Sequence, residues 1–270
     1  MRMDENKEEA TVKLILFYFL LLLISSLAGT AYSAKIIPMD LIYVSLIIYV
    51  LIFNRVLDGD TIISLGILRE NALPYFILGF LLSASMISLV IFILVIGGIA
   101  TIHYTGSLEV LELLRYLILF LSIAFAEELI FRAYPLKVLT KSFSPIFSAI
   151  ITGIIFSLMH SLNIGYNLIA LINLFLIGVF LALLFVLTRN IFLVAGFHMG
   201  WNLIEGIIFG LPVSGFIYSD TVFTLELSIN EVLLSGGSFG IEASLATTTI
   251  ASIFLALTIL NLNKLSKRIK

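Results

Sequence analysis

YNLIALINLFLIGVFLALLFVLT, residues 166–188, decides the fold class of this chain. The stretch contains no Asp, Glu, Lys, Arg or His. A hydrocarbon core about 30 Å thick takes roughly 20 apolar residues of helix to cross, and this run is long enough. The sequence therefore predicts a transmembrane helix here, and the rest of the chain repeats the pattern.

The composition of the 270 residues also indicates a lipid environment. Hydrophobic residues make up 61% of the chain and charged residues only 12%, too little polar surface to cover such an apolar chain in water. The formal net charge of −2 gives no basic field that would favour nucleic acid. There is no cysteine, which excludes disulfides, thiolate metal sites and a cysteine nucleophile.

The length criterion places eight helices in a polytopic, all-α membrane bundle, which we expect to be a single membrane domain over residues 1–270. The polar, acidic segment 1–13 lacks the features of a cleavable signal, so the first span is expected to remain as an anchor. The mixed stretch 58–72 predicts a short interfacial helix. The eight spans lie near residues 14–33, 39–54, 74–102, 113–135, 145–163, 166–188, 190–211 and 244–262.

The distribution of basic residues predicts that both termini are cytoplasmic in a cell membrane. Short cytoplasmic loops collect Lys and Arg. With the N-terminus inside, only Lys35 falls outside, and the long external loop 211–243 contains acidic residues, including Glu231, but no Lys or Arg. Arg115 and Arg132 lie within spans. The residues that fall inside are Arg2, Lys7, Lys13, Arg55, Arg69, Lys137, Lys141, Arg189, Lys264, Lys267, Arg268 and Lys270.

Ionisable side chains within spans are costly in hydrocarbon, so each is a candidate for function. The fourth span contains the sequence EELIFR, in which Glu128 and Arg132 are four residues apart with the acid on the N-terminal side. This is the favourable order for an ion pair, so we expect these two residues to support the structure. Glu127 is turned about 100° from Glu128 around the helix. It can therefore face another partner and act as a general acid or base.

Two of the three histidines lie in other spans. His160 ends the sequence FSLMH in the fifth span, and the sequence HMGWN in the seventh span places His198 and Asn202 on one helical face. Two such donors that converge on one point could stabilise an oxyanion. His103, at the outer end of the third span, is assigned no role.

Two alternatives use the same residues. Glu127, Glu128 and Arg132 could form an inert ion network that locks helices together. Glu127, His160 and His198 could instead bind zinc, since three N/O ligands and a water are typical of catalytic zinc. The short-spaced ligand pair of an HExxH motif is absent from the sequence, and Asn202 fits a zinc site poorly.

The three motifs, EExxxR, FxxxH and HxxxN in that order within 120–210, resemble those of the CPBP family of intramembrane proteases. This family includes Rce1-like CAAX prenyl proteases and bacteriocin-processing enzymes of the Abi family. The resemblance implies catalytic residues on helices 4, 5 and 7, with Glu127 and His160 activating a water, His198 and Asn202 stabilising the oxyanion, and Glu128 and Arg132 in support. It further implies a glutamate-type endopeptidase that uses no cofactor or metal.

The expected partners are the lipid bilayer and a lipidated or membrane-embedded peptide substrate. A non-catalytic protein of the same fold, giving bacteriocin self-immunity or acting as a scaffold, is the alternative function. A small transporter that uses Glu127 as a proton site is a third, although the two halves of the chain show no matching interrupted helices.

The depths of two candidate residues do not match on this layout. If the fourth span ends near Pro135, Glu127 lies about 12 Å from the cytoplasmic edge, and His160 lies deeper. We therefore expect the fifth span to enter late, after an interfacial stretch near residues 141–146, or the bilayer to be deformed locally. A separation of more than about 8 Å between the Glu127 carboxylate and the His160 ring would contradict the catalytic hypothesis.

Overall fold

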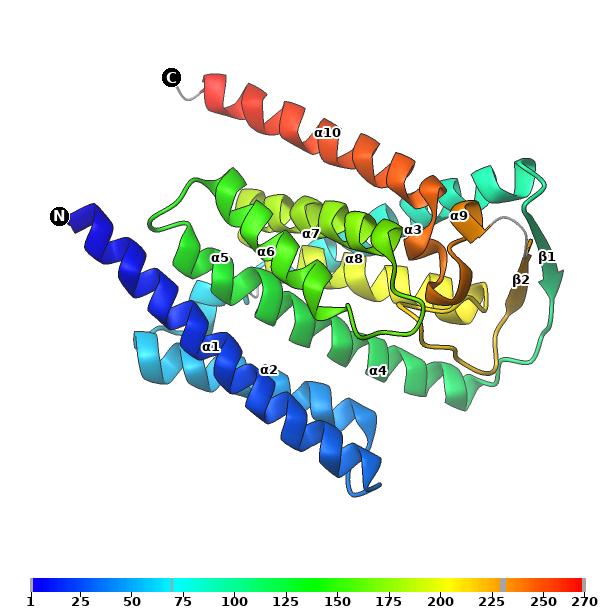
Figure 1. Ribbon diagram of the computed structural model, residues 1–270, viewed down its shortest axis with the longest axis horizontal. Helices are drawn as coiled ribbons and strands as arrows, with labels where there is room; N and C mark the ends of the chain where they lie inside the picture. Colours follow the sequence, from blue (N-terminus) through cyan, green and yellow to red (C-terminus); the bar gives the residue numbers. More distant parts are fainter. Residues whose placement is uncertain (1, 69, 229–231, 269–270) are drawn as a thin grey trace.

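The computed structural model describes residues 2–68, 70–228 and 232–268 as a helical bundle with a small two-stranded sheet at one end (Figure 1). Arg69, Glu231 and Lys270, which entered the charge argument, lie outside the described residues. The helices are α1 (Arg2–Ser33), α2 (Met39–Asp58), α3 (Ala72–Ile96), α4 (Val110–Glu128), α5 (Tyr134–Leu139), α6 (Pro145–Met159), α7 (Leu168–Thr188), α8 (Ile191–Leu203), α9 (Val232–Ser235) and α10 (Leu245–Arg268), and the strands are β1 (Ala100–Tyr104) and β2 (Phe223–Leu227).

Six of the described helices are long and apolar enough to cross a membrane, so the protein is a polytopic helical membrane protein. The other two expected spans differ in kind: 113–135 lies within a continuous helical run from Val110 to Leu139 that contains charged residues, and α6 has only 15 residues. The six candidate spans are Lys7–Ser33, Met39–Asp58, Ala72–Ile96, Leu168–Thr188, Ile191–Ile208 and Leu245–Leu262.

The expected end of one span was wrong, and the short helix expected at 58–72 is present only as a 3₁₀ helix of four residues. The predicted third span 74–102 is too long: α3 ends at Ile96, and Gly98 adopts a left-handed conformation (φ 69°) that turns the chain out of the helix. Residues 100–104 then form β1, which pairs antiparallel with β2. The segment 58–72 forms only a short 3₁₀ turn, Ile62–Leu65, because Gly59 and Gly66 end helical structure on both sides of it.

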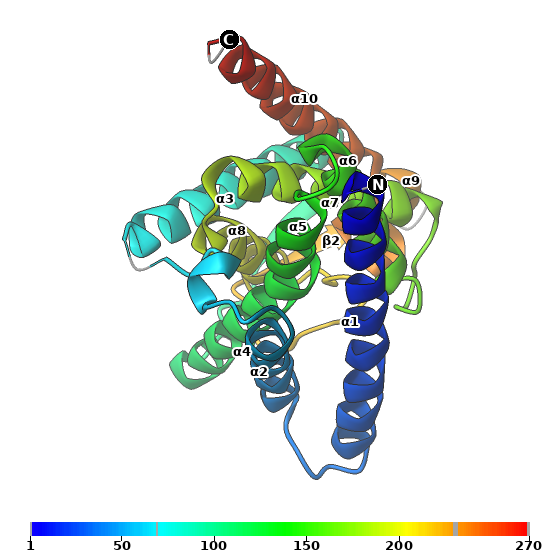
Figure 2. The same cartoon turned by 90° about the vertical axis from the view of Figure 1, so that its left-hand side faces the viewer.

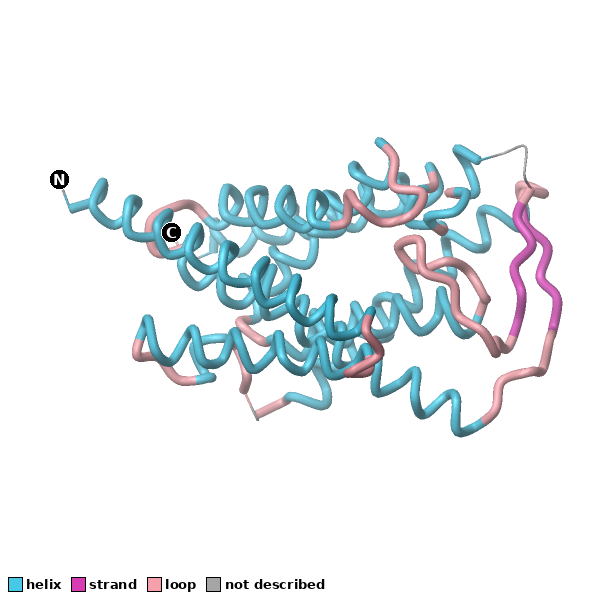
Figure 3. The backbone as a smooth tube through the Cα atoms, turned by 60° about the horizontal axis from the view of Figure 1, so that its bottom comes forward, coloured by secondary structure: helices cyan, strands magenta, loops and turns pink. Residues whose placement is uncertain are grey.

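The sheet and the termini lie at opposite ends of the bundle (Figures 1 and 3). The α5–α6 turn lies at the same end as the termini, as the charge pattern requires for one side of a membrane. Arg115 stands near the start of α4, is well exposed and pairs with Glu112, so it needs no buried partner.

Helices α1 and α2 form a hairpin on the side of the bundle opposite α10 (Figure 2). An aromatic cluster holds the hairpin to α5: the ring of Phe17 stacks on Tyr134 at 4.5 Å, and the Tyr49 hydroxyl donates to the Phe17 carbonyl at 2.6 Å. At the end near the termini, Asp58 accepts from Lys13 at 2.8 Å and from Lys137 at 2.9 Å. These contacts join α1, α2 and α5 to one another.

The closest helix packing is between α3 and α8. Gly79 on α3 lies against the backbone of α8, where an added Cβ would come 1.9 Å from the Leu193 carbonyl oxygen. A Cβ added to Gly196 on α8 would likewise come 2.2 Å from the Phe76 carbonyl oxygen. Small residues allow this approach in membrane helices, where dispersion contacts drive association. The packing fixes α8, the helix that carries the HxxxN motif.

Replacement of Gly79 by Ala should therefore destabilise the protein. The new methyl group overlaps the α8 backbone, which cannot move aside as a flexible side chain would, and such overpacking costs about 1–3 kcal/mol. We expect the Tm in detergent to fall by roughly 4–10 °C. Gly29→Ala is the matched control, because nothing lies within 4 Å of its added Cβ, and it should leave the Tm unchanged or slightly raised. Equal effects of the two substitutions would contradict the close packing.

Candidate active site

The helix that carries Glu127 and Glu128 changes its hydrogen-bond register directly after them. Residues Leu129–Ala133 form a π-helical segment, and the helix then continues through Pro135 to Leu139. In this register Pro135, which has no N–H, cannot donate to the carbonyl of Ile130. The hydroxyl of Tyr18 on α1 donates to that oxygen at 3.2 Å. The proline therefore does not end the span, contrary to the boundary expected from the sequence.

This continuation removes the mismatch in depth. Measured from Leu139, Glu127 lies about 18 Å into the helix at 1.5 Å per residue. His160 follows the short helix α6, which is about 22 Å long by the same rise. α6 begins at Pro145, where the predicted fifth span also begins, with Ser144 as its N-cap. The two residues meet because α4–α5 is longer and α6 shorter than the sequence indicated.

Glu127 faces two imidazole rings. Its Oε2 lies 3.8 Å from Nε2 of His160 and 3.9 Å from Nε2 of His198. Both distances are well below the limit of about 8 Å that would have contradicted the catalytic hypothesis. The same oxygen is buried and has no hydrogen-bond partner among the described residues.

Glu128 points the other way, into the bundle, and is fully buried. Its Oε1 accepts from Nη1 of Arg132 at 2.9 Å and from Nδ1 of His198 at 2.8 Å. The expected ion pair with Arg132 is therefore present, and Glu128 also orients His198. The sequence had indicated the first contact but not the second, because His198 lies on a helix 70 residues away in the sequence.

The Nδ1 atom of each imidazole ring also makes a hydrogen bond. Nδ1 of His160 lies 2.8 Å from the carbonyl oxygen of Phe156, which can only accept, so this nitrogen donates. Nδ1 of His198 donates to Glu128. Both rings consequently present Nε2 toward Glu127.

Phe156, the first residue of the FxxxH motif, packs among the charged groups. The guanidinium carbon of Arg132 lies 4.0 Å above the centre of its ring. The rings of His160 and His198 contact it edge to face, with centroids 4.7 Å and 6.4 Å away. The phenyl ring thus contacts Arg132 and both imidazoles, and its π face attracts the guanidinium cation.

Glu127, His160 and Asn202 line a cavity of about 230 Å³. The Asn202 amide makes no hydrogen bond to the residues that the structure describes, and it lies on the same helix as His198. Most of the wall is apolar and comes from α1, α2, α4 and the segment after α8. The remaining lining residues include Leu21, Tyr43, Leu46, Ile123, Phe131, Met159, Asn163, Val213, Ser214, Phe216 and Tyr218.

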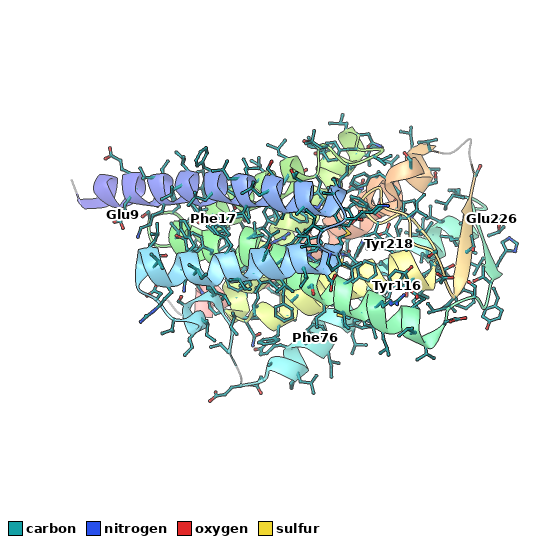
Figure 4. All side chains as sticks on the ribbon, turned by 90° about the horizontal axis from the view of Figure 1, so that it is seen from below. Glu9, Phe17, Phe76, Tyr116, Tyr218 and Glu226 are labelled. Carbon is teal, nitrogen blue, oxygen red and sulfur yellow. The ribbon has the colours of Figure 1, made fainter. Side chains whose placement is uncertain are left out.

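Tyr218 brings the external segment to this cavity. Its ring contacts Tyr116 at 5.6 Å and Phe120 at 5.0 Å, both on α4, and Figure 4 shows the two tyrosines next to each other. Burial raises the pKa of the Tyr218 hydroxyl, and the negative charge of Glu127 raises it further. Tyr218 therefore remains a neutral hydroxyl close to the carboxylate.

The zinc alternative requires Glu127, His160 and His198 to converge on one ion. Within the described ranges, no set of three or more His, Asp or Glu side chains is arranged to hold a metal ion. We therefore derive no chemical step through a metal below.

One buried acid, Glu205, was not predicted from the sequence; it lies one turn after Asn202 and is fully buried. Its Oε2 accepts from the indole N–H of Trp201 at 2.8 Å, and its Oε1 accepts from the backbone N–H of Ile241 at 3.1 Å. The sequence does contain the signal: Glu205 is an acid within an apolar span, and such an acid is a candidate for function just as Glu127 is.

Comparison with known proteins gives one family match. The fold and site define a polytopic membrane protein with a buried Glu/His/Asn cluster. Residues 109–204 match the family model described as type II CAAX prenyl endopeptidase Rce1-like, a segment that spans all three motifs, and this supports the assignment of the chain to the CPBP/CAAX protease family. No curated protein matches the chain.

Loss of the Glu128–Arg132 ion pair should lower the stability of the protein much more than loss of the Glu127 carboxylate. Arg132→Met leaves the buried Glu128 without its guanidinium, and breaking a buried ion pair from one side costs about 3–5 kcal/mol. We expect a fall in Tm of roughly 10 °C or more. Glu127→Gln should change the Tm by no more than about 2 °C, because the nearest basic nitrogens lie 3.8 Å and 3.9 Å away, beyond hydrogen-bond distance. A large loss of stability in both variants would favour the inert ion network.

Tyr18→Phe tests the π-helical segment. Loss of the hydroxyl leaves the Ile130 carbonyl without its donor, at a cost of about 1 kcal/mol, so the Tm should fall by roughly 2–4 °C. Tyr32→Phe, on the same helix with an exposed ring, is the control and should have no effect. An unchanged Tm in Tyr18→Phe would show that the Ile130 carbonyl is satisfied in another way.

Proposed function

We propose that this protein is an intramembrane endopeptidase of glutamate type that hydrolyses a peptide bond in a lipidated or membrane-embedded substrate. The observation that carries the proposal is the convergence of Glu127 Oε2 with Nε2 of His160 and His198 beside the cavity. We assign the catalytic roles to Glu127, His160, His198 and Asn202, with Glu128 and Arg132 as supporting residues.

The nucleophile is a water held between Glu127 and His160. With 3.8 Å between the two side-chain atoms, one oxygen at about 2.8 Å from each can hydrogen-bond to both. His160 donates from Nδ1 to a neutral carbonyl, so its Nε2 keeps a lone pair and accepts from the water. Glu127 takes the proton as the water oxygen bonds to the scissile carbonyl carbon. It then returns the proton to the departing amine as the C–N bond breaks.

The oxyanion is stabilised by His198 and Asn202. His198 donates from Nδ1 to the Glu128 carboxylate, so it can carry a second proton at Nε2 as an imidazolium. This proton also balances the charge of the cluster: two carboxylates, Glu127 and Glu128, face one guanidinium and one imidazolium. Charges buried in a bundle are tolerated when they are paired in this way. The Asn202 amide supplies a second donor.

The bilayer and a membrane-borne peptide are the proposed partners. The cavity is lined largely by apolar side chains, some of them from the α1–α2 hairpin, which suits an apolar peptide delivered from lipid. We place the protein in the cell membrane with both termini in the cytoplasm, on the basis of the distribution of Lys and Arg. No cofactor is assigned to the reaction.

Cleavage of a fluorogenic farnesylated CAAX peptide by the protein purified in detergent tests this function. We expect Glu127→Gln to lower kcat by about 10²–10⁴, because the proton acceptor is lost. Asn202→Ala should lower kcat by about 10²–10³, as loss of one oxyanion donor does. His160→Ala and His198→Ala should also abolish most activity. The same peptide without the prenyl group shows whether the lipid is required.

Glu226→Gln is the matched control, since this acid is exposed on β2 and far from the cavity. Cleavage that survives both Glu127→Gln and His198→Ala would refute the site. Cleavage abolished by a chelator and restored by zinc would replace the metal-free mechanism.

A further inference from the structure

A second pair of buried acids lies beside the candidate active site. Glu205 on the π-helical segment after α8 is fully buried, and Glu242 in the segment before α10 is 6% exposed. Neither is required by the proposed chemistry. Their hydrogen bonds join two stretches of the external segment, 211–218 and 236–243, to each other and to α8.

Glu205 fixes the glycine-rich stretch 236–243 to α8. Its Oε1 accepts from the backbone N–H of Ile241, and a Cβ on Gly240 would come 2.8 Å from the same oxygen. Gly240 has a φ of 104° and lies against the carbonyl of Pro212, where a Cβ would come 1.9 Å from the oxygen. Only glycine fits this position, so the stretch 236–243 is held tightly between α8 and the segment 211–218.

Glu242, which this stretch carries, holds Ser214. Oε2 of Glu242 accepts from the Ser214 backbone N–H at 2.7 Å and from its hydroxyl at 2.6 Å. On the other side, the Asn163 amide donates to the Ser214 carbonyl at 3.0 Å. Ser214 has a φ of 47°, a strained conformation for a residue other than glycine, which persists only where its surroundings determine it strongly.

Ser214 and Asn163 are both part of the cavity wall, together with Val213, Phe216 and Tyr218 of the same segment. Val213, Ser214, Phe216 and Tyr218 come from the external segment. Asn163 and His160 follow α6, and Glu127 comes from α4. The conformation of the wall therefore depends on Ser214, and Ser214 depends on the Glu242 carboxylate.

We propose that Glu242 is a positioning residue: through its two hydrogen bonds to Ser214 it sets the external wall of the cavity, against which the substrate peptide binds. Glu205 holds Glu242 in place from α8, so the wall is fixed to the same helix that presents His198 and Asn202. The effect on the substrate rests on the proposed function, whereas the effect on the wall does not.

Hydrogen exchange of the purified protein in detergent tests the effect on the wall without any substrate. Glu242→Gln replaces the carboxyl group with an amide. Both hydrogen bonds from Ser214 end on one oxygen, Oε2, so they are lost together if the NH₂ group takes that position and weakened together if the amide oxygen takes it. We expect amides of the segment 211–218 to exchange about tenfold faster or more, because both hydrogen bonds that hold Ser214 to Glu242 are weakened or lost together. Amides at the α3–α8 contact should be unchanged.

Ser214→Ala is a milder variant that removes only the hydroxyl donor, and it keeps the test valid should Glu242→Gln fail to fold. The double variant should exchange little faster than Glu242→Gln alone, because both changes act on one contact. Glu226→Gln, in the same external segment but exposed on β2, is the matched control (Figure 4). Unchanged exchange in both Glu242→Gln and Ser214→Ala would overturn the proposal.

Steady-state cleavage separates positioning from chemistry. If Glu242 orders the wall, Glu242→Gln should raise KM by about tenfold and leave kcat within about twofold, since Glu127 and His160 are untouched. A fall in kcat with an unchanged KM would overturn the proposal, because Glu242 would then act on the reacting groups. If the wild type cleaves no peptide, the proposed function fails, and the exchange measurement still decides whether Glu242 holds the wall.

Discussion

One buried carboxylate, that of Glu128, joins the parts of the site that come from distant stretches of the chain. A single oxygen accepts from Arg132 on its own helix and from His198 on α8. In the low dielectric of a helix bundle, such charge-assisted bonds are strong, and leaving either partner unpaired is costly. The orientation of His198, and with it the distance from His198 to Glu127, follows from this contact. Phe156 connects a third helix, α6, to this contact, because its ring packs on Arg132.

Both helices that carry acids of the site contain a π-helical segment. The first segment begins directly after Glu128. The second begins after Leu203, two residues beyond Asn202. A π-helical segment shifts the hydrogen-bond register, and such segments are frequent at functional sites. Here the first segment accommodates Pro135 and exposes a carbonyl that Tyr18 satisfies from α1. The α1–α2 hairpin, which also lines the cavity, is thereby joined to the helix that carries Glu127.

The external segment contributes more than a connection between α8 and α10. Glu205 and Glu242 bring the stretches 211–218 and 236–243 against α8, and Asn163 holds the same turn from the end of α6. The candidate site is therefore enclosed by bilayer helices on one side and by a segment ordered through buried acids on the other. Close packing of α3 on α8 through Gly79 and Gly196 holds the helix on which both sides depend.

The sequence by itself determined the membrane class, the approximate position of most helices, and the two different faces of Glu127 and Glu128. These follow from local properties: the length of apolar runs and the 100° turn per residue of a helix. It did not determine that the helix continues beyond Pro135, that residues 100–104 leave the third span for a strand, or that Glu205 and Glu242 hold the cavity wall. Each of these depends on a partner far away in the sequence, such as Tyr18, β2 or Ser214. Only the tertiary structure brings those partners together, because packing and hydrogen bonding between distant segments override local propensity.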